Sequence, residues 1–146
     1  MDISEKNFEA AIERILLGEL QAANLGGASV AGDVQGGYLG VPGGYRKRAP
    51  EEYDRALCLD PGAVMDFIYA TQPAEWDKLK KQHGPDAKDH LLKRLAEEVR
   101  ARGTLEVLRK GIKDNGCKFQ LAYFRPASGL NESIRKLYEA NLFTVV

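Results

Sequence analysis

Three glutamates recur every fourth residue near the start of the chain. Glu5, Glu9 and Glu13 fall in a segment whose apolar residues repeat at helical spacing, so they lie along one face of a predicted helix. Carboxylate oxygens are the ligands that hard divalent cations take, and one or two from the protein are often enough. Acids near a helix N-terminus are also favourable without a metal. On spacing alone, we therefore interpret the three as an exposed acidic face.

A second cluster carries positive charge. The run "YRKR" places Arg46, Lys47 and Arg48 directly after Tyr45. Such a cluster can hold the phosphate backbone of DNA, although short basic runs are commonly solvated surface. The three cations are therefore candidate DNA-binding residues, with a solvated surface as the alternative.

The two histidines of the chain, His83 and His90, occur in predicted helices. Neither has a cysteine or carboxylate at the sequence spacing of a known metal motif. We interpret both as surface residues, with Asp86 and His90 forming an ordinary helix pair four residues apart.

Cysteine and serine give no catalytic pattern. Cys58 and Cys117 are far apart and belong to no CxxC motif, which argues against a disulfide framework and favours a reducing compartment. We expect both cysteines to be buried as small apolar residues. Ser128 and Ser133 have no histidine within a recognisable motif, so no nucleophile is predicted.

The segment 24–49 is dense in glycine and is predicted to be a long loop. It lacks the Lys-Ser/Thr pair of a P-loop and does not join a strand to a helix, so neither phosphate-binding fingerprint applies. A connector is the better interpretation. A loop of this length is either mobile or functional, and we expect the former.

Composition sets broad limits. The chain has 146 residues, 44% of them hydrophobic and 29% charged, with 21 basic and 21 acidic side chains and a net charge of zero. One domain over 1–146 is expected. Neutrality argues against an autonomous nucleic-acid-binding protein, which usually carries a basic excess. No secretory signal and no apolar run of membrane-spanning length occur, so a cytoplasmic protein without a membrane partner is expected.

Helical patterns dominate the elements that must position these residues. A first helix is predicted within 1–23, and 50–115 reads as a series of helices that begins at "PEEYDRALCL". Asp60 and Pro61 form an N-terminal signal, whereas Gly84 and Gly103 mark helix ends. The last helix of the series is predicted to end at Asn115-Gly116.

Strand patterns appear only within 116–146. Residues 117–124 alternate between apolar and polar, Asn131 caps a short helix, and residues 142–146 form an apolar strand. The predicted class is α+β, predominantly helical. Because two strands do not make a stable sheet, we expect the sheet to be incomplete. The terminal strand should either pair in parallel with 117–124 or bridge two copies into a weak homodimer.

Two long segments carry a family resemblance. "YDRALCLDPGAVMDFIYATQPAEWDKL" and "RGTLEVLRKGIKDNGCKFQLAYFRPASGLNESIRKLYEANLFTVV" resemble the N-terminal region of the restriction (R) subunit of type I restriction–modification enzymes. The likeness rests mainly on the Thr-Gln-Pro…Trp turn at 71–76, the Arg-Gly-Thr-Leu step at 102–105 and the loop 126–131. It runs from "FEAAIERIL" to the last valine, and only the stretch 25–44 matches nothing.

The resemblance implies an ATP-dependent restriction endonuclease as the parent. In that family a magnesium-dependent PD-(D/E)xK nuclease domain precedes ATP-driven motor domains, and the subunit joins modification and specificity subunits on double-stranded DNA. The family's catalytic aspartate and Glu-x-Lys match positions beyond Val146. This chain is therefore expected to be an inactive fragment without a cofactor of its own, in which a helical part leads into an incomplete nuclease sheet. The family also implies that Glu9 is an accessory metal ligand.

One alternative belongs to a different functional class. The helices of 51–114 have no counterpart in a minimal nuclease core, which favours a helical interaction module that docks the R subunit onto the methyltransferase core or flanking DNA. A ligand-binding domain that uses the glycine-rich loop is a third interpretation.

Overall fold

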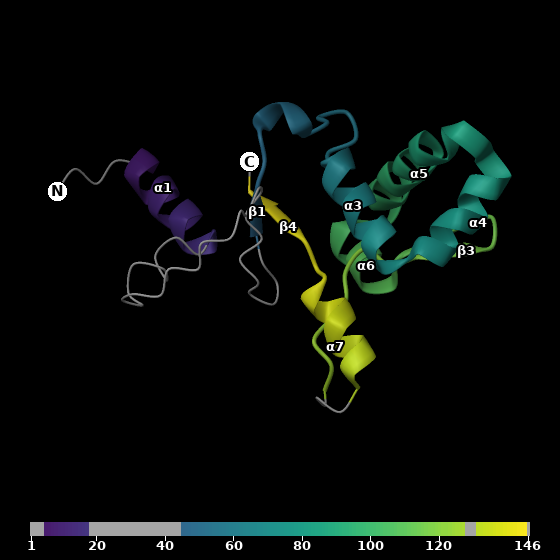
Figure 1. Cartoon of the computed structure of the whole chain (residues 1–146). Helices are drawn as coiled ribbons and strands as arrows, with labels where there is room; N and C mark the ends of the chain where they lie inside the picture. The colour runs from purple at the N-terminus through teal and green to yellow at the C-terminus, as the bar shows by residue number, and fades with distance from the viewer. Residues whose placement is uncertain (1–4, 18–44, 128–130, 146) are drawn as a thin grey trace, which may run out of the picture.

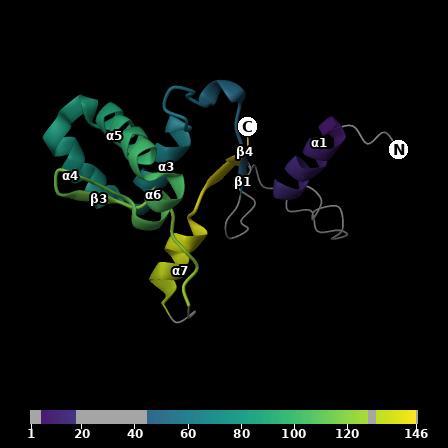
Figure 2. The ribbon, with the colours of Figure 1, turned by 180° about the vertical axis from the view of Figure 1, so that it is seen from behind.

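The computed structural model describes residues 5–17, 45–127 and 131–145. Within these ranges the chain is α+β and mostly helical, as predicted, and Figures 1 and 2 show the elements from opposite sides. No helix in these ranges is both long and apolar enough to cross a membrane. In chain order the elements are α1 (Glu5–Leu16), β1 (Tyr45–Lys47), a 3-10 turn η1 (Pro50–Glu52), α3 (Pro61–Thr71), α4 (Pro73–His83), a 3-10 turn η2 (Gly84–Asp86), α5 (Ala87–Arg102), α6 (Thr104–Lys110), β2 (Ile112–Asp114), β3 (Cys117–Phe119), α7 (Glu132–Glu139) and β4 (Phe143–Val145).

Helices α3 to α6 form one body whose boundaries follow local sequence signals. The Asp60 carboxylate accepts a hydrogen bond from Ala63 N at 2.9 Å, and Pro61 occupies the first turn of α3, as predicted. Helices α4 and α5 end at Gly84 and Gly103, also as predicted. The body encloses the apolar core, which consists of Met65, Phe67, Ile68, Leu79, Leu91, Leu92, Leu95, Val107, Ile112, Cys117 and Phe119.

A short antiparallel hairpin, β2–β3, completes this body by packing on α4 and α5. Ile112 pairs with Phe119, and both side chains are buried. The predicted helix through Asn115 is therefore wrong, because α6 ends at Lys110 and the chain reverses at Asn115-Gly116. Asn-Gly is the preferred pair for a two-residue hairpin turn, since both positions need a left-handed backbone.

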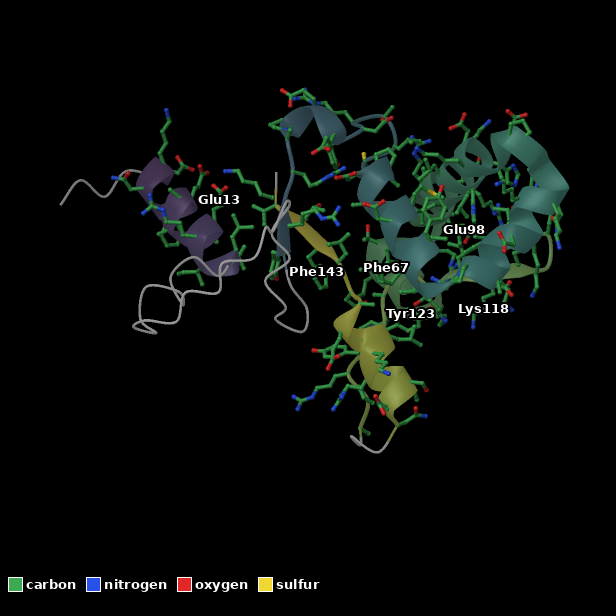
Figure 3. The ribbon with its side chains drawn as sticks, in the orientation of Figure 1. Glu13, Phe67, Glu98, Lys118, Tyr123 and Phe143 are labelled. Carbon is green, nitrogen blue, oxygen red and sulfur yellow. The ribbon has the colours of Figure 1, made fainter. Side chains whose placement is uncertain are left out.

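Two side-chain amides replace backbone partners just after β3. Gln72 accepts from Gln120 N at 2.7 Å and donates to Gln120 O at 2.9 Å, and Asn141 makes the same pair of bonds with Tyr123 at 2.8 and 2.6 Å. The predicted strand 117–124 consequently ends at Phe119. Tyr123 stays packed against Phe67, with ring centroids 5.9 Å apart (Figure 3).

The terminal strand pairs with a segment distant in sequence. Strand β4 lies parallel to β1, with Tyr45 opposite Phe143 and Lys47 opposite Val145. The predicted pairing of 142–146 with 117–124 is therefore wrong, and so is the assignment of 45–47 to the loop 24–49. Most of that loop lies outside the described residues. Figure 1 shows the β1–β4 pair between α1 and the helical body.

The segment between β1 and α3 also differs from prediction. The expected helix over "PEEYDRALCL" is limited to the 3-10 turn η1, and the Asp54 carboxylate then accepts bonds from Ala56 N and Leu57 N at 2.8 and 3.0 Å. An aspartate that bonds to the following backbone in this way stabilises a turn at the expense of a helix. Cys58 is exposed here, contrary to prediction, whereas Cys117 is buried as expected.

Candidate nucleic-acid interface

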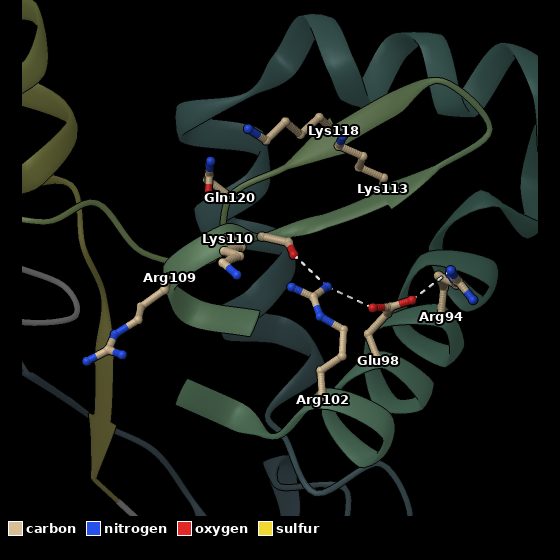
Figure 4. Close-up of a pocket in the computed structure, with 9 residues that line it drawn as sticks. Arg94, Glu98, Arg102, Arg109, Lys110, Lys113, Lys118 and Gln120 are labelled. Carbon is tan, nitrogen blue, oxygen red and sulfur yellow. Dashed lines mark hydrogen bonds and ion pairs between the residues drawn. The ribbon is translucent and has the colours of Figure 1, made fainter. Parts of the chain in front are cut away.

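An open basic pocket of about 530 Å³ lies where α5, α6 and the β2–β3 hairpin meet (Figure 4). Six of its lining side chains are cationic and a single one is acidic, so the pocket is strongly positive although the whole chain is neutral. Its lining residues are Arg94, Glu98, Arg102, Arg109, Lys110, Gly111, Lys113, Lys118 and Gln120.

The hairpin places two lysines directly opposite each other. Lys113 and Lys118 are register partners on the outward face of β2–β3, because their neighbours Ile112 and Phe119 point into the core. Like charges in this position destabilise a hairpin. Both residues are exposed, and neither forms an ion pair with any part of the chain that the structure describes. The repulsion within this pair is therefore a cost to folding that no ion pair among the described residues offsets.

The opposite wall of the pocket is a fixed pair of guanidiniums. Glu98 on α5 forms an ion pair with Arg94 at 2.7 Å and accepts a hydrogen bond from Arg102 at 2.8 Å, and Arg102 also donates to the Gly111 carbonyl at 3.1 Å (Figure 4). The hydrogen bond from Arg102, together with the charge of Arg94, lowers the pKa of Glu98 below its ordinary value. The carboxylate thus stays ionised and holds both cations in place.

One hydrogen-bond donor in this wall has no partner among the described residues. Arg94 Nε is buried and has no hydrogen-bond partner within the described residues. A buried donor without a partner is costly and usually finds water or a ligand. At the rim, Lys110 forms an ion pair with Glu106 at 2.5 Å. Arg109 forms no ion pair among the described residues. The pocket therefore has cationic donors available for an anion.

The chemistry that this arrangement supports is anion binding. Guanidinium and ammonium groups on several walls suit phosphate groups, for which arginine offers a two-donor fork and lysine a point charge. The lining contains no cysteine, serine or histidine and only a single carboxylate, which is engaged by two arginines. The pocket lining thus contains no thiol, hydroxyl or imidazole group.

The basic run predicted to bind DNA lies elsewhere, on and next to β1. Arg46 pairs with Asp66 at 3.0 Å, Lys47 forms an ion pair with Glu13 of α1 (Figure 3), and Arg48 binds Asp60. Each cation already has a carboxylate partner within the chain, and none of the three lines the basic pocket. DNA binding by this run stays a prediction, and its cations would have to exchange partners to achieve it.

Glu9 lies exposed on α1. It does not belong to any group of three potential metal ligands among the described residues. The metal-binding role of Glu9 therefore has no support from a cluster of ligands in this part of the chain and stays a prediction.

The histidines are closer to a carboxylate than the sequence suggested. His90 Nε2 lies 2.6 Å from Asp114 Oδ2, and the His90 ring stacks on His83 with centroids 3.8 Å apart. The predicted pairing of His90 with Asp86 is therefore wrong. Sequence spacing does not reveal this group, because Asp114 comes from β2, where the sequence predicts a helix. The opposed lysines of the pocket are not predicted either, because Lys113 and Lys118 meet only when β2 pairs with β3.

Searches of protein-family models, curated proteins and solved structures gave no match to this chain.

Proposed function

We propose that this chain is the N-terminal part of the restriction subunit of a type I restriction–modification enzyme, and that its helical body contacts the backbone of double-stranded DNA through the basic pocket. The sequence resemblance supports the first half of the proposal. In such an enzyme, magnesium-dependent cleavage and ATP-driven translocation belong to other parts of the subunit. The β1–β4 pair is then the start of the nuclease sheet, and modification and specificity subunits complete the assembly.

The observation that carries the DNA contact is the opposed lysine pair. The ammonium groups of Lys113 and Lys118 repel each other on the hairpin and form no ion pair in the described chain. On α5 and α7, by contrast, charged side chains pair with opposite charges one turn away. A phosphate between or beside the two ammonium groups removes that repulsion. DNA supplies a regular series of such phosphates.

The test measures binding of a fluorescent DNA duplex of arbitrary sequence by anisotropy at several salt concentrations. We expect the double variant Lys113→Ala/Lys118→Ala to bind more weakly than the wild type on every sequence. The slope of log K against log salt should become less steep by about two, because each phosphate contact contributes about 0.9. Its thermal stability should be unchanged or raised, because a like-charge pair has been removed.

Lys80→Ala/Lys81→Ala on α4 is the matched control, since it removes the same charge from two exposed lysines outside the pocket. It should leave the salt slope within error of the wild type. Equal weakening by both double variants would mean that only net charge matters and would contradict the proposed site.

A docking role is the second candidate function, and α1 favours it. This helix has no buried residue. Its apolar residues Phe8 and Ile15 are 65% and 60% exposed, and Ile12 lies on the same side of the helix. Scattered apolar residues are normal on surfaces, but an aligned stripe usually marks an interface. The proposed partner is the methyltransferase core that is built from modification and specificity subunits.

Replacement of the exposed apolar residues of α1 tests docking onto the methyltransferase core. The variant Phe8→Ser/Ile15→Ser should lose co-sedimentation with the assembled methyltransferase, because the apolar contact is removed. Its DNA affinity in the anisotropy assay should stay at the wild-type value, since α1 does not line the basic pocket. Unchanged co-sedimentation would remove α1 from the docking surface.

A further inference from the structure

A second cluster of polar side chains lies away from the basic pocket, where the turn between α4 and α5 meets the end of β2. His83 is the last residue of α4, His90 lies in the first turns of α5, and Asp114 ends β2. One ligand atom from each residue lies within 4.8 Å of the other two, and all three residues are partly buried. Among the described residues this is the one group of three with metal-ligand atoms so close.

The fold, and not an adjacent sequence motif, brings these residues together. The 3-10 turn η2 reverses the chain between the two helices, which allows the imidazole rings to stack with an interplanar angle of 19°. On the hairpin, Asp114 shares the inward face with Ile112, and this directs its carboxylate away from the pocket lysines and toward His90. Only 12% of the Asp114 side chain is exposed.

Hydrogen bonding indicates which imidazole nitrogens carry a proton. Asn115 Nδ2 lies 3.2 Å from His83 Nε2, and an amide nitrogen can only donate, so His83 Nε2 accepts and carries a lone pair. His90 Nε2 donates to Asp114 Oδ2 at 2.6 Å, since a carboxylate accepts. The arrangement therefore offers a lone pair on His83 Nε2, which now accepts from Asn115, and a second on His90 Nε2 when the proton of that ring lies on Nδ1.

The distances suit a small divalent ion. Zinc binds imidazole nitrogen and carboxylate oxygen at about 2.0–2.2 Å, which places the ligand atoms of a tetrahedral site about 3.3 Å apart. The His90–Asp114 pair must separate slightly and the third atom must approach, both by side-chain rotation in partly exposed residues. Two imidazoles with one carboxylate favour zinc and its first-row neighbours over magnesium or calcium, which prefer oxygen ligands alone.

We infer that His83, His90 and Asp114 form a binding site for a zinc-class divalent transition-metal ion, with a fourth position open to solvent or a partner. Coordination through His90 Nε2 requires the ring proton to lie on Nδ1, which a neutral ring reaches by tautomerisation and an imidazolium by release of its Nε2 proton to solvent. The ion also takes the place of the Asn115 amide at His83 Nε2. The bound ion joins α4, α5 and β2 through one residue from each, in addition to the apolar core that these elements share. This inference does not depend on the proposed DNA contact, because the two sites share no residue.

Imidazole NMR on the full, tag-free chain tests the site directly. The sequence contains two histidines, so every imidazole nitrogen signal belongs to this cluster. Addition of zinc chloride should shift one nitrogen of each ring to the metal-bound range and should raise the melting temperature, because an ion that binds only the folded state stabilises it. Unshifted imidazole signals with zinc in excess would overturn the inference.

Variants then separate a built site from surface adsorption. Cobalt(II) titrated into the wild type should give visible absorption, and His90→Gln and Asp114→Asn should each weaken cobalt affinity at least about tenfold, the smallest loss expected even for a residue that only supports a ligand. Asp89→Asn, an exposed acid on the same helix outside the cluster, should bind as the wild type does. Equal affinity in all four proteins would overturn the inference. If a variant fails to fold, the NMR result on the wild type alone tests the site.

Discussion

Asp60 has two structural tasks at the point where the strand β1 is joined to the helical body. It caps α3 through Ala63 N and binds Arg48 through both carboxylate oxygens, at 2.7 and 3.2 Å. Burial alone raises the pKa of Asp60, but the hydrogen bonds from Arg48 and from Ala63 N outweigh it and lower the pKa below 3.8. The ionised carboxylate is therefore the form that the fold selects.

The substitution Asp60→Asn separates the two tasks, because asparagine still caps a helix but carries no charge. We expect the free energy of unfolding at neutral pH to fall by about 3 kcal/mol, since removal of one partner from a largely buried ion pair leaves the other without compensation. Arg48 retains Glu52 at 3.0 Å, which places the loss at the lower end of the range. Urea unfolding measures it.

The lowered pKa of Asp60 determines how its contribution to stability changes with pH. A carboxyl group with a lowered pKa stabilises the fold above its unfolded-state pKa, and this contribution disappears as pH falls through the folded-state value. The difference between wild type and Asp60→Asn should thus shrink below pH 3.8. Asp66→Asn, in an exposed pair with Arg46, should cost under about 1 kcal/mol. A difference at Asp60 that persists unchanged at low pH would contradict this account.

At the scale of elements, Gly111 decides where α6 ends and β2 begins. Its φ of 67° lies in the left-handed region, and a Cβ atom there would lie 2.2 Å from the Phe119 carbonyl oxygen. Glycine therefore permits both the backbone turn and the close approach of the two hairpin strands. Without it, β2 cannot pair with β3 at this register.

Gly111→Ala should lower the free energy of unfolding by at least about 2 kcal/mol, because backbone strain and a collision with main-chain atoms act together. Gly103→Ala is the matched control: this helix-end glycine has a φ of 83° and open space around its Cβ position. Its cost should be smaller than that of Gly111→Ala, because backbone strain acts there without a collision. Equal losses in the two variants, measured by thermal or urea unfolding, would show that the contact with Phe119 is unimportant.

The elements that the sequence predicts well are those with local signals. Asp60-Pro61, Gly84 and Gly103 mark helix ends correctly because capping depends on residues one turn away. The hairpin has a local signal too, Asn115-Gly116, but this pair also fits a helix end, because the residues before it follow a helical pattern.

Non-local pairing was beyond prediction for a physical reason. The β1–β4 pair joins three residues to three residues almost a hundred positions away, and neither segment carries information about the other. The end of β3 depends on amides from Gln72 and Asn141, which no alternation pattern reveals. The basic pocket follows the same rule, since it needs α5, α6 and the hairpin in place before its cations meet.

Across the whole molecule the net charge is zero, but the charges are unevenly distributed. The chain has equal numbers of acidic and basic side chains, yet six cations gather at one pocket. A balanced total excludes a uniformly basic protein, but it does not exclude a local phosphate site, because screening limits charge effects to about 10 Å. The proposed DNA contact is of this local kind and suits a part of a larger DNA-handling enzyme.

An NMR titration of the labelled chain with a short DNA duplex tests the proposed contact most directly. We expect backbone amide shifts to concentrate at Arg109, Lys113, Lys118 and Gln120 around the pocket and to fade as salt is raised. Shifts that concentrate instead at the basic run 46–48, or that are absent at low salt, would contradict it.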